Sequence, residues 1–279
     1  MNGRARVLIA GCGYVGAATA ALLRRRGDEV FGVRRTAVRL PEGATSVAID
    51  LLDDDLSALP PRLDAVVWAM SPTSDEQGYR RAYVDGPARL LDFLAQRGDP
   101  VQRAVLVGST SVWHRTDGAD VDEATATSPA DFRGRAVLDG EAVFAGGPFH
   151  SVALRFAGIY GPGRTRLLDR IASGEAAPPR RAVHGNRIWR DDGAKAIVHA
   201  LTLADPDPVD VVVDDEPADL REVYAWLAER LGVALPAPSD SFAGRGGDKR
   251  CRNTRLRDSG FEPDVPDFRA GYSILCNQR

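Results

Sequence analysis

Short apolar runs alternate with helical patterns through most of the chain. Runs rich in Val, Ile, Leu and Ala lie at residues 6–11, 29–35, 46–50, 65–70, 103–109 and 151–158. The segments between them, such as 14–27 and 79–98, repeat apolar positions with the period of an amphipathic helix. Strands that are apolar on both faces belong to a parallel sheet that helices cover on each side. The pattern predicts an α/β fold with a doubly wound parallel sheet.

The pattern changes after "YGPG" at residues 160–163. Proline, arginine and alanine become frequent there, and "EAAPPRRAVHGN" (175–186) is typical of a surface loop. A strand at 209–213, a helix at 219–232 and a Gly/Arg-rich segment at 242–253 follow. We therefore expect a smaller second unit in the C-terminal part of the chain.

Composition and charge narrow the class of protein. With 279 residues, 44% of them hydrophobic and 27% charged, the chain can bury a full core. The net charge is −3 and the basic residues form no block, so we expect neither a nucleic acid nor a membrane as partner. Three cysteines (Cys12, Cys251 and Cys276) show no disulfide or metal-type spacing, and no metal is expected. We find no signal peptide and no membrane-spanning run, which predicts a cytoplasmic protein.

A glycine-rich turn carries the first chemical signal. Gly11, Gly13 and Gly16 form G-x-G-x-x-G directly after the first strand and at the start of the first helix. Such glycines permit a tight turn, close approach of a pyrophosphate, and close packing of helix on strand, and the helix N-terminus attracts the anion. Tyr14 and Val15 begin this helix and are candidate contacts as well. The motif predicts dinucleotide binding.

The ends of the second and third strands bear on which dinucleotide binds. An acidic residue after the second strand would bind the ribose 2′-hydroxyl, whereas an arginine would pair with a 2′-phosphate. Here the strand ends in Arg34 and Arg35, which favours NADP, with NAD possible; the alternative is two solvated charges. Asp50, at the end of the third strand, is placed to contact the adenine through its side chain or the adjacent backbone.

With these motifs in place, the sequence resembles the extended short-chain dehydrogenase/reductase family, specifically its atypical NAD-dependent epimerase/dehydratase-like members. "VLVGSTSVW" (105–113) resembles the family's fifth strand, and "LRFAGIYGPGR" (154–164) resembles the segment that leads into the substrate region. Residues 186–201 and 249–263 resemble two further segments of the same subgroup. One departure is Ala10, where the extended family usually has glycine.

The resemblance implies a division of the chain. A Rossmann domain that binds NAD(P) would span residues 1–163, with 186–201 returning to it, and a small substrate-binding lobe would span 164–279. It also implies a small-molecule substrate, for which a sugar nucleotide is one possibility. A homodimer through the helices at 79–97 and 131–145 is a further expectation, because extended family members often pair through the equivalent helices.

The family's catalytic pair is missing from this sequence. The family carries Tyr-x-x-x-Lys on the helix after the serine strand, where the tyrosine moves the substrate proton and the lysine lowers its pKa. Aligning Gly140 and Glu141 with the family's "GE" places Arg133 at the tyrosine position and Val137 at the lysine position. No tyrosine occurs between Tyr83 and Tyr160, and no Tyr-x-x-x-Lys exists anywhere in the chain.

Ser109 and Arg133 are the remaining candidates for catalysis. Ser109 stands at the family's serine position and could bind a substrate oxygen or simply cap a turn. Arginine stays protonated in proteins, so Arg133 could stabilise negative charge in the nicotinamide end of the cleft but could hardly move a proton. If Arg133 instead pairs with a neighbour such as Asp131, the catalytic role fails.

Two classes of function stay open at this stage. The first is an NAD(P)-dependent oxidoreductase or epimerase with an unusual proton donor, or with one that water or the substrate supplies. The second is a protein that binds NADP(H) without turnover, as a sensor or scaffold. A complete glycine turn beside a missing catalytic pair fits both.

Overall fold

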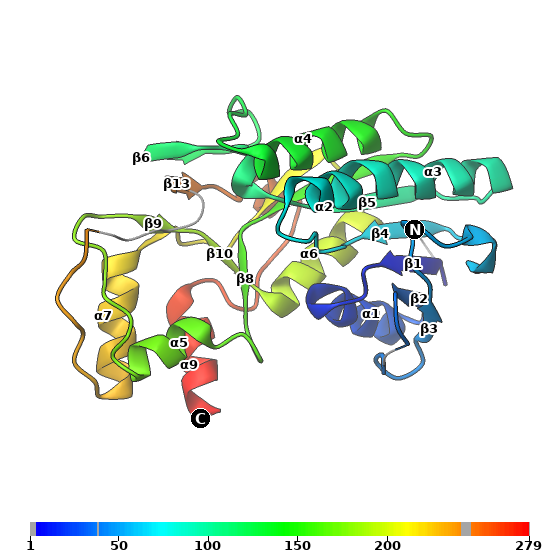
Figure 1. Ribbon diagram of the computed structural model, residues 1–279. Helices are drawn as coiled ribbons and strands as arrows, with labels where there is room; N and C mark the ends of the chain where they lie inside the picture. Colours follow the sequence, from blue (N-terminus) through cyan, green and yellow to red (C-terminus); the bar gives the residue numbers. More distant parts are fainter. Residues whose placement is uncertain (1–3, 38, 241–246, 279) are drawn as a thin grey trace.

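A seven-stranded parallel sheet forms the centre of the computed structural model (Figure 1), which describes residues 4–37, 39–240 and 247–278. In spatial order the strands are β11 (Val209–Val212), β7 (Ser151–Phe156), β5 (Arg103–Ser109), β4 (Ala65–Trp68), β1 (Arg6–Ala10), β2 (Glu29–Arg34) and β3 (Thr45–Ala48). Every neighbouring pair is parallel. The strands that the apolar runs predict are all present, and the predicted fold class is confirmed.

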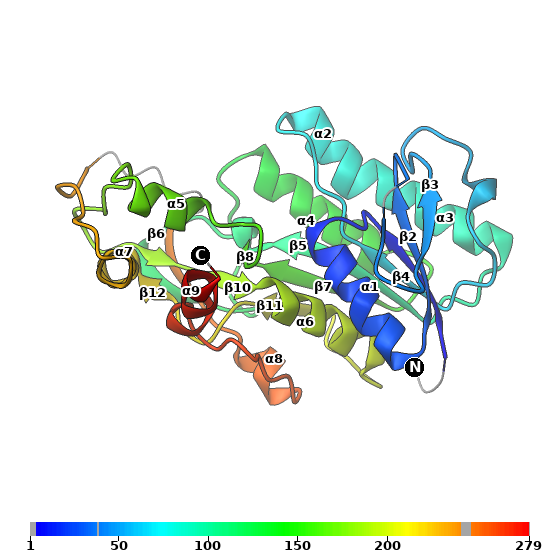
Figure 2. The same ribbon diagram turned by 90° about the horizontal axis from the view of Figure 1, so that it is seen from below.

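Helices cover both faces of this sheet. On one face lie α1 (Tyr14–Arg26) and α6 (Arg190–Thr202), which pack against each other. On the other face lie α2 (Glu76–Arg80), a π-helical turn η2 (Arg81–Asp85), α3 (Gly86–Arg97) and α4 (Phe132–Ala145). Figure 2 shows the two sets on opposite sides of the strands. Each face buries its own apolar core, as the absence of polar alternation in the strands requires.

The smaller lobe is built around a third apolar core. Helices α5 (Arg166–Ala172), α7 (Leu220–Leu231) and α9 (Phe268–Asn277) surround it, and α8 (Thr254–Asp258) precedes α9. Three short strand pairs complete the structure: β8 (Gly158–Tyr160) with β10 (Arg187–Trp189), β9 (His184–Gly185) with β12 (Ala218–Asp219), and β6 (Arg115–Val121) with β13 (Gly247–Cys251). Figure 1 shows the lobe beside the carboxyl ends of the central strands.

The expected boundary at residue 163 does not separate the sheet from the lobe, because segments on both sides of it pair with each other. Strand β11 comes from beyond that boundary, yet it pairs with β7 at the edge of the central sheet. Strand β6 comes from before it, yet it pairs with β13. The polar sequence of β6, "RTDGADV", carries no strand signal, and β13 lies in the Gly/Arg-rich segment, whose first residues are outside the described part.

Helices α3 and α4 lie side by side on one face of the sheet, and the homodimer expected through them stays a prediction. Within the described ranges, no helix combines the length and the apolar character that crossing a bilayer requires.

Candidate functional site

A cleft of about 410 Å³ runs along the carboxyl ends of β1, β2, β4, β5 and β7. In open parallel α/β sheets, this edge is where ligands bind. The glycine turn and the end of β2 line one part of the cleft, and Ser109 and the segment after β7 line another. Sequence positions that are far apart thus meet in one elongated site.

Each glycine of the turn has a distinct structural reason. Gly11 has φ +83°, and a Cβ there would lie 2.7 Å from the backbone of Ala69 and Met70. A Cβ on Gly16 would lie 2.9 Å from the Gly11 carbonyl oxygen, so its absence lets α1 close on the strand. A Cβ on Gly13 would meet only that same carbonyl oxygen, at 3.9 Å, and Gly13 lines the cleft. The turn therefore leaves open the approach that a pyrophosphate needs.

The N-terminus of α1 adds to this anion-binding character. Tyr14 and Val15 begin the helix and line the cleft, and the first turn holds no acidic residue. The first backbone N–H groups of a helix have no partner within it, and they carry partial positive charge. The Tyr14 hydroxyl donates to the Pro162 carbonyl oxygen at 2.9 Å, and the Arg164 guanidinium lies 4.1 Å from its ring centroid.

The charges that line the cleft are all positive. Arg34 and Arg35 line it at the end of β2 and are exposed, and Arg164 lines it near Tyr14. Among the described lining residues there is no aspartate or glutamate. A site of this charge suits a ligand that carries phosphates, and the guanidinium groups of two adjacent arginines suit a 2′-phosphate in particular.

Asp50 lies beside the cleft, not in its lining. Its carboxylate accepts from the Leu52 N–H at 3.0 Å, and its own N–H donates to Asp54. The residues on each side of it, Ile49 and Leu51, do line the cleft. The structure therefore places the residues that flank Asp50, and not the Asp50 side chain, in the lining of the cleft.

Ser109 stands at the end of β5, where it caps a turn and also lines the cleft. Its Oγ accepts from the Ser111 N–H at 3.1 Å and so caps the short 3-10 turn η3 (Thr110–Val112). Ser109 also lines the cleft. Because the cap uses Oγ only as an acceptor, the hydroxyl proton stays available for a ligand.

A family model for the NAD-dependent epimerase/dehydratase family matches residues 7–214. The chain belongs to this family. A solved structure of a putative NAD-dependent epimerase/dehydratase from Methylobacillus flagellatus is 34% identical, covers 99% of both chains and has a TM-score of 0.84.

Two further comparisons are more distant. UDP-glucose 4-epimerase of Thermus thermophilus, solved in complex with NAD, shares the fold with a TM-score of 0.80, 21% identity and 98% coverage of both chains. The curated 3-diazoavenalumate denitrifying reductase of a Streptomyces species is 26% identical over an alignment of 255 residues, and the match covers 83% of each protein.

Arg133, at the family's tyrosine position, does not occupy the cleft. Its guanidinium donates to Asp131 at 2.8 Å and lies 4.6 Å from the Phe132 ring centroid. It is absent from the described residues that line the site. The expectation that Arg133 faces the nicotinamide end is therefore wrong for this structure, because Asp131, the N-cap of α4, holds the guanidinium at the helix start. We do not carry its catalytic role further.

Val137 fills the family's lysine position without charge. It is 1% exposed, and a Cβ on Gly108 would lie 3.4 Å from its Cγ1. Gly108 lines the cleft, so an aliphatic side chain stands next to the site at the lysine position. The ribose contact and the pKa adjustment expected of a lysine cannot come from this residue.

Tyr83 lines the cleft although no sequence motif points to it. It lies on the π-helical turn η2, inside a segment whose sequence pattern predicts one continuous helix. Its ring stacks on that of Tyr79, with centroids 5.9 Å apart. Tyr83 lies outside any Tyr-x-x-x-Lys motif, so the sequence gives no signal for it. The structure identifies it because it lines the cleft together with Gly108 and Ser109 of β5.

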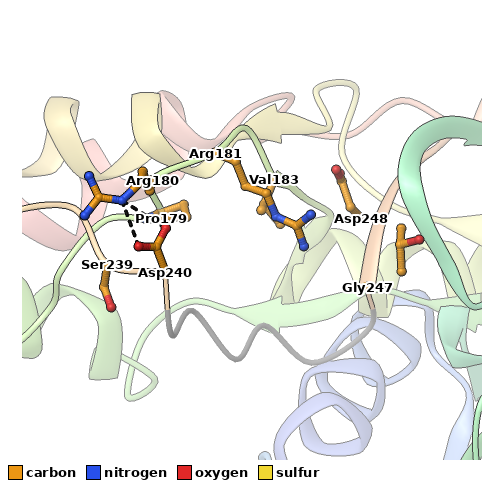
Figure 3. A pocket seen from close by; sticks show the side chains of 9 residues that line it. Pro179, Arg180, Arg181, Val183, Ser239, Asp240, Gly247 and Asp248 are labelled. Carbon is orange, nitrogen blue, oxygen red and sulfur yellow. Dashed lines mark hydrogen bonds and ion pairs between the residues drawn. The ribbon is translucent and has the colours of Figure 1, made fainter.

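A second cavity lies in the lobe (Figure 3). Its lining includes Arg180, whose guanidinium pairs with Asp240, and Asp248. Asp248 accepts from His184, whose Nδ1 lies 2.8 Å from the carboxylate. Most of the charged groups in this cavity are paired with one another. The cleft at the carboxyl ends of the strands differs, because its described lining holds arginines and no acidic residue.

Proposed function

We propose that the chain is an NADP(H)-dependent oxidoreductase or epimerase of the extended short-chain type, acting on a small molecule without a Tyr-x-x-x-Lys pair. The observation that carries the proposal is that one cleft contains the glycine turn, Arg34 and Arg35, and Ser109. The glycine turn and the two arginines suit a dinucleotide, and the serine stands where the family places a group that touches the substrate.

The residues present fit the cofactor. Gly13 leaves space beside the N-terminus of α1 for the pyrophosphate, and Arg34 and Arg35 would pair with a 2′-phosphate. The bound dinucleotide would supply or accept a hydride. Ser109 would donate a hydrogen bond to the substrate oxygen and so orient the carbon that exchanges the hydride. The curated relative is named a reductase, which supports the oxidoreductase branch of the proposal.

A second candidate is a protein that binds NADP(H) without turnover. Two observations favour it: the chain contains no Tyr-x-x-x-Lys, and Arg133 is paired with Asp131 outside the cleft. The cofactor experiment below applies to both candidates, and the turnover experiment separates them.

Cofactor choice is tested by calorimetric titration with NADPH and NADH. We expect tighter binding of NADPH, and Arg34→Ala combined with Arg35→Ala should weaken NADPH chiefly. Each well-formed charge-assisted bond contributes about 1.5–3 kcal/mol. Arg25→Ala, which removes an exposed arginine at the far end of α1, serves as a control and should change neither affinity. Equal affinities of the unmutated protein for the two cofactors would refute the NADP assignment.

Turnover is tested by following NADPH fluorescence with a panel of aldehydes, ketones and sugar nucleotides. If the chain is an enzyme, Ser109→Ala should lower kcat while leaving the NADPH affinity nearly unchanged, because Ser109 is not assigned to the phosphates. If no compound on the panel oxidises NADPH above background, the oxidoreductase branch fails. Because an epimerase restores its cofactor in each turnover, the non-catalytic candidate is the better description only if no sugar nucleotide is converted to an isomer either.

A further inference from the structure

The Tyr83 side chain combines burial with access to the cleft. Its exposed fraction is 8%, yet it lines the same cleft as Gly108 and Ser109. It lies on the π-helical turn between α2 and α3. Such turns widen a helix locally and are frequent at functional sites. The extra residue in this turn changes the direction in which the following side chains point.

Neighbouring groups hold Tyr83 in place. A Cβ on Gly140 would lie 2.6 Å from the Tyr83 carbonyl oxygen and 3.2 Å from its Cβ, so the missing side chain lets α4 close on this residue. On the outer side, Tyr79 stacks on Tyr83 and meets the Phe132 ring edge-on, with centroids 5.5 Å apart. An aromatic row therefore connects the cleft to the first turn of α4, the helix on which the family carries its tyrosine.

The Tyr83 hydroxyl has no hydrogen-bond partner among the described residues. By contrast, the Tyr14 and Tyr160 hydroxyls donate to the carbonyl oxygens of Pro162 and Asp267. The Tyr83 hydroxyl is not among the described polar atoms that are both buried and unpaired, so it reaches the open space of the cleft. A ligand oxygen there can replace water as its hydrogen-bond acceptor.

The protonation state of Tyr83 suits a donor. Burial, and to a smaller degree Tyr79, raise the pKa of Tyr83 to about 12. The phenol therefore keeps its proton at neutral pH. It can donate a hydrogen bond or a proton to a ligand oxygen, whereas it would act poorly as a base.

We propose that Tyr83 is the proton donor of the reduction, taking the role of the tyrosine that the family's helix lacks here. This inference rests on the proposed function. As a hydride from the reduced nicotinamide adds to the carbonyl carbon of the substrate, the π electron pair of the C–O bond moves to oxygen. The Tyr83 O–H bond breaks, an O–H bond forms on the substrate, and the phenolate then takes a proton from water.

The position of Tyr83 is tested without turnover by fluorine NMR of the protein labelled with 3-fluorotyrosine. The chain has six tyrosines, so Tyr83→Phe identifies one resonance by its loss and Tyr79→Phe identifies its neighbour. We expect the Tyr83 resonance to shift with NADP⁺ and not with 2′,5′-ADP, which lacks the nicotinamide half. NAD⁺ and ADP are compared in the same way, in case the protein prefers the cofactor without the 2′-phosphate. The proposal is overturned if the Tyr83 resonance shifts with neither NADP⁺ nor NAD⁺. It is also overturned if 2′,5′-ADP or ADP shifts the resonance as much as the full dinucleotide does.

The chemical role is tested with the carbonyl compound that the turnover panel identifies. Tyr83→Phe should lower kcat by about 100-fold or more, the usual contribution of a positioned acid, with an unchanged NADPH dissociation constant. The control Tyr224→Phe removes a hydroxyl from a tyrosine of the lobe core that does not line the cleft, and it should retain activity. Full activity of Tyr83→Phe overturns the proposal while the proposed function survives. If the unmutated protein reduces nothing while the resonance shifts, the reductase branch of the proposed function fails, and proton donation to a carbonyl oxygen fails with it.

Discussion

Gly11 and Gly13 are two residues apart and need glycine for different reasons. At Gly11 the backbone has φ +83° and a side chain would collide with the chain after β4. At Gly13 φ is −93°, and the space for a side chain is open to the cleft. The first glycine is thus required by the fold, whereas the second is required by the ligand that we propose.

Gly13→Ala should separate binding from stability. The added methyl group occupies the approach of the pyrophosphate, so we expect at least a tenfold rise in the NADPH dissociation constant, which corresponds to about 1.4 kcal/mol. The free energy of unfolding should change much less. Gly11→Ala is the contrasting variant and should lower the free energy of unfolding by about 1–3 kcal/mol, because it forces a residue with a Cβ into the left-handed region and against backbone atoms. Urea denaturation and calorimetric titration measure the two quantities, and unchanged cofactor affinity in Gly13→Ala would contradict the assignment.

At the scale of the element, a local cap holds the first turn of helix α4. Its N-cap, Asp131, accepts from the backbone N–H groups of Arg133 at 3.0 Å and Gly134 at 3.3 Å. The same carboxylate takes the Arg133 guanidinium. Local capping therefore engages Arg133, whose guanidinium is held at the helix start and does not line the cleft.

Asp131→Ala should cost about 1 kcal/mol of unfolding free energy, the usual contribution of an N-cap. Asp131→Asn keeps a capping oxygen and loses only an exposed ion pair, so it should cost a few tenths of a kcal/mol. Burial acts to raise the pKa of Asp131, but the hydrogen bonds from Arg133 and Gly134 outweigh it and lower that pKa below 3.8. The contribution of the carboxylate is therefore present above pH 3.8 and is lost as the pH falls through the depressed value. Thermal or urea unfolding should show the difference between the protein and Asp131→Ala closing in acid, and a constant difference would contradict this account.

At the scale of the whole molecule, the junction of sheet and lobe contains an unusual carboxyl group. Asp210 lies on β11 and is 3% exposed, and its Oδ1 has no hydrogen-bond partner within the described residues. Burial first, and then the charges of Glu123 and Asp207, raise the pKa of Asp210 to about 7, while Arg255 opposes the shift. The carboxyl group is thus stable in the fold mainly in its neutral form.

The unfolding free energy should fall as the pH rises through this group's titration. Between pH 3.8 and about 7 the folded chain holds the proton on Asp210 that the unfolded chain releases, so raising the pH favours unfolding. The full effect is at most about 4 kcal/mol. Asp210→Asn keeps the shape without the charge and should be more stable than the unmutated protein at a pH of about 8, with a smaller advantage at a pH of about 5. Urea unfolding at the two pH values measures this, and an advantage that does not grow with pH would contradict it.

The sequence by itself determined the features that depend on local chain chemistry. The apolar runs specified the strands because a buried parallel strand needs apolar residues on both faces. The glycine turn could be recognised because a left-handed turn and a close helix contact exclude other residues. Arg34 and Arg35 line the cleft where the strand pattern placed them, since a residue at the carboxyl end of a parallel strand always reaches this edge.

Only the tertiary structure decided which side chains line the cleft near Ser109. For Arg133 the sequence left both the cleft and Asp131 open, and the structure shows the pair with Asp131. Tyr83 lines the cleft from a π-helical turn on which α4 packs closely at Gly140. The pairing of β6 with β13 likewise depends on contacts between residues more than a hundred positions apart. Periodicity encodes which face of an element is buried, whereas the direction of one side chain depends on what packs against it from elsewhere in the chain.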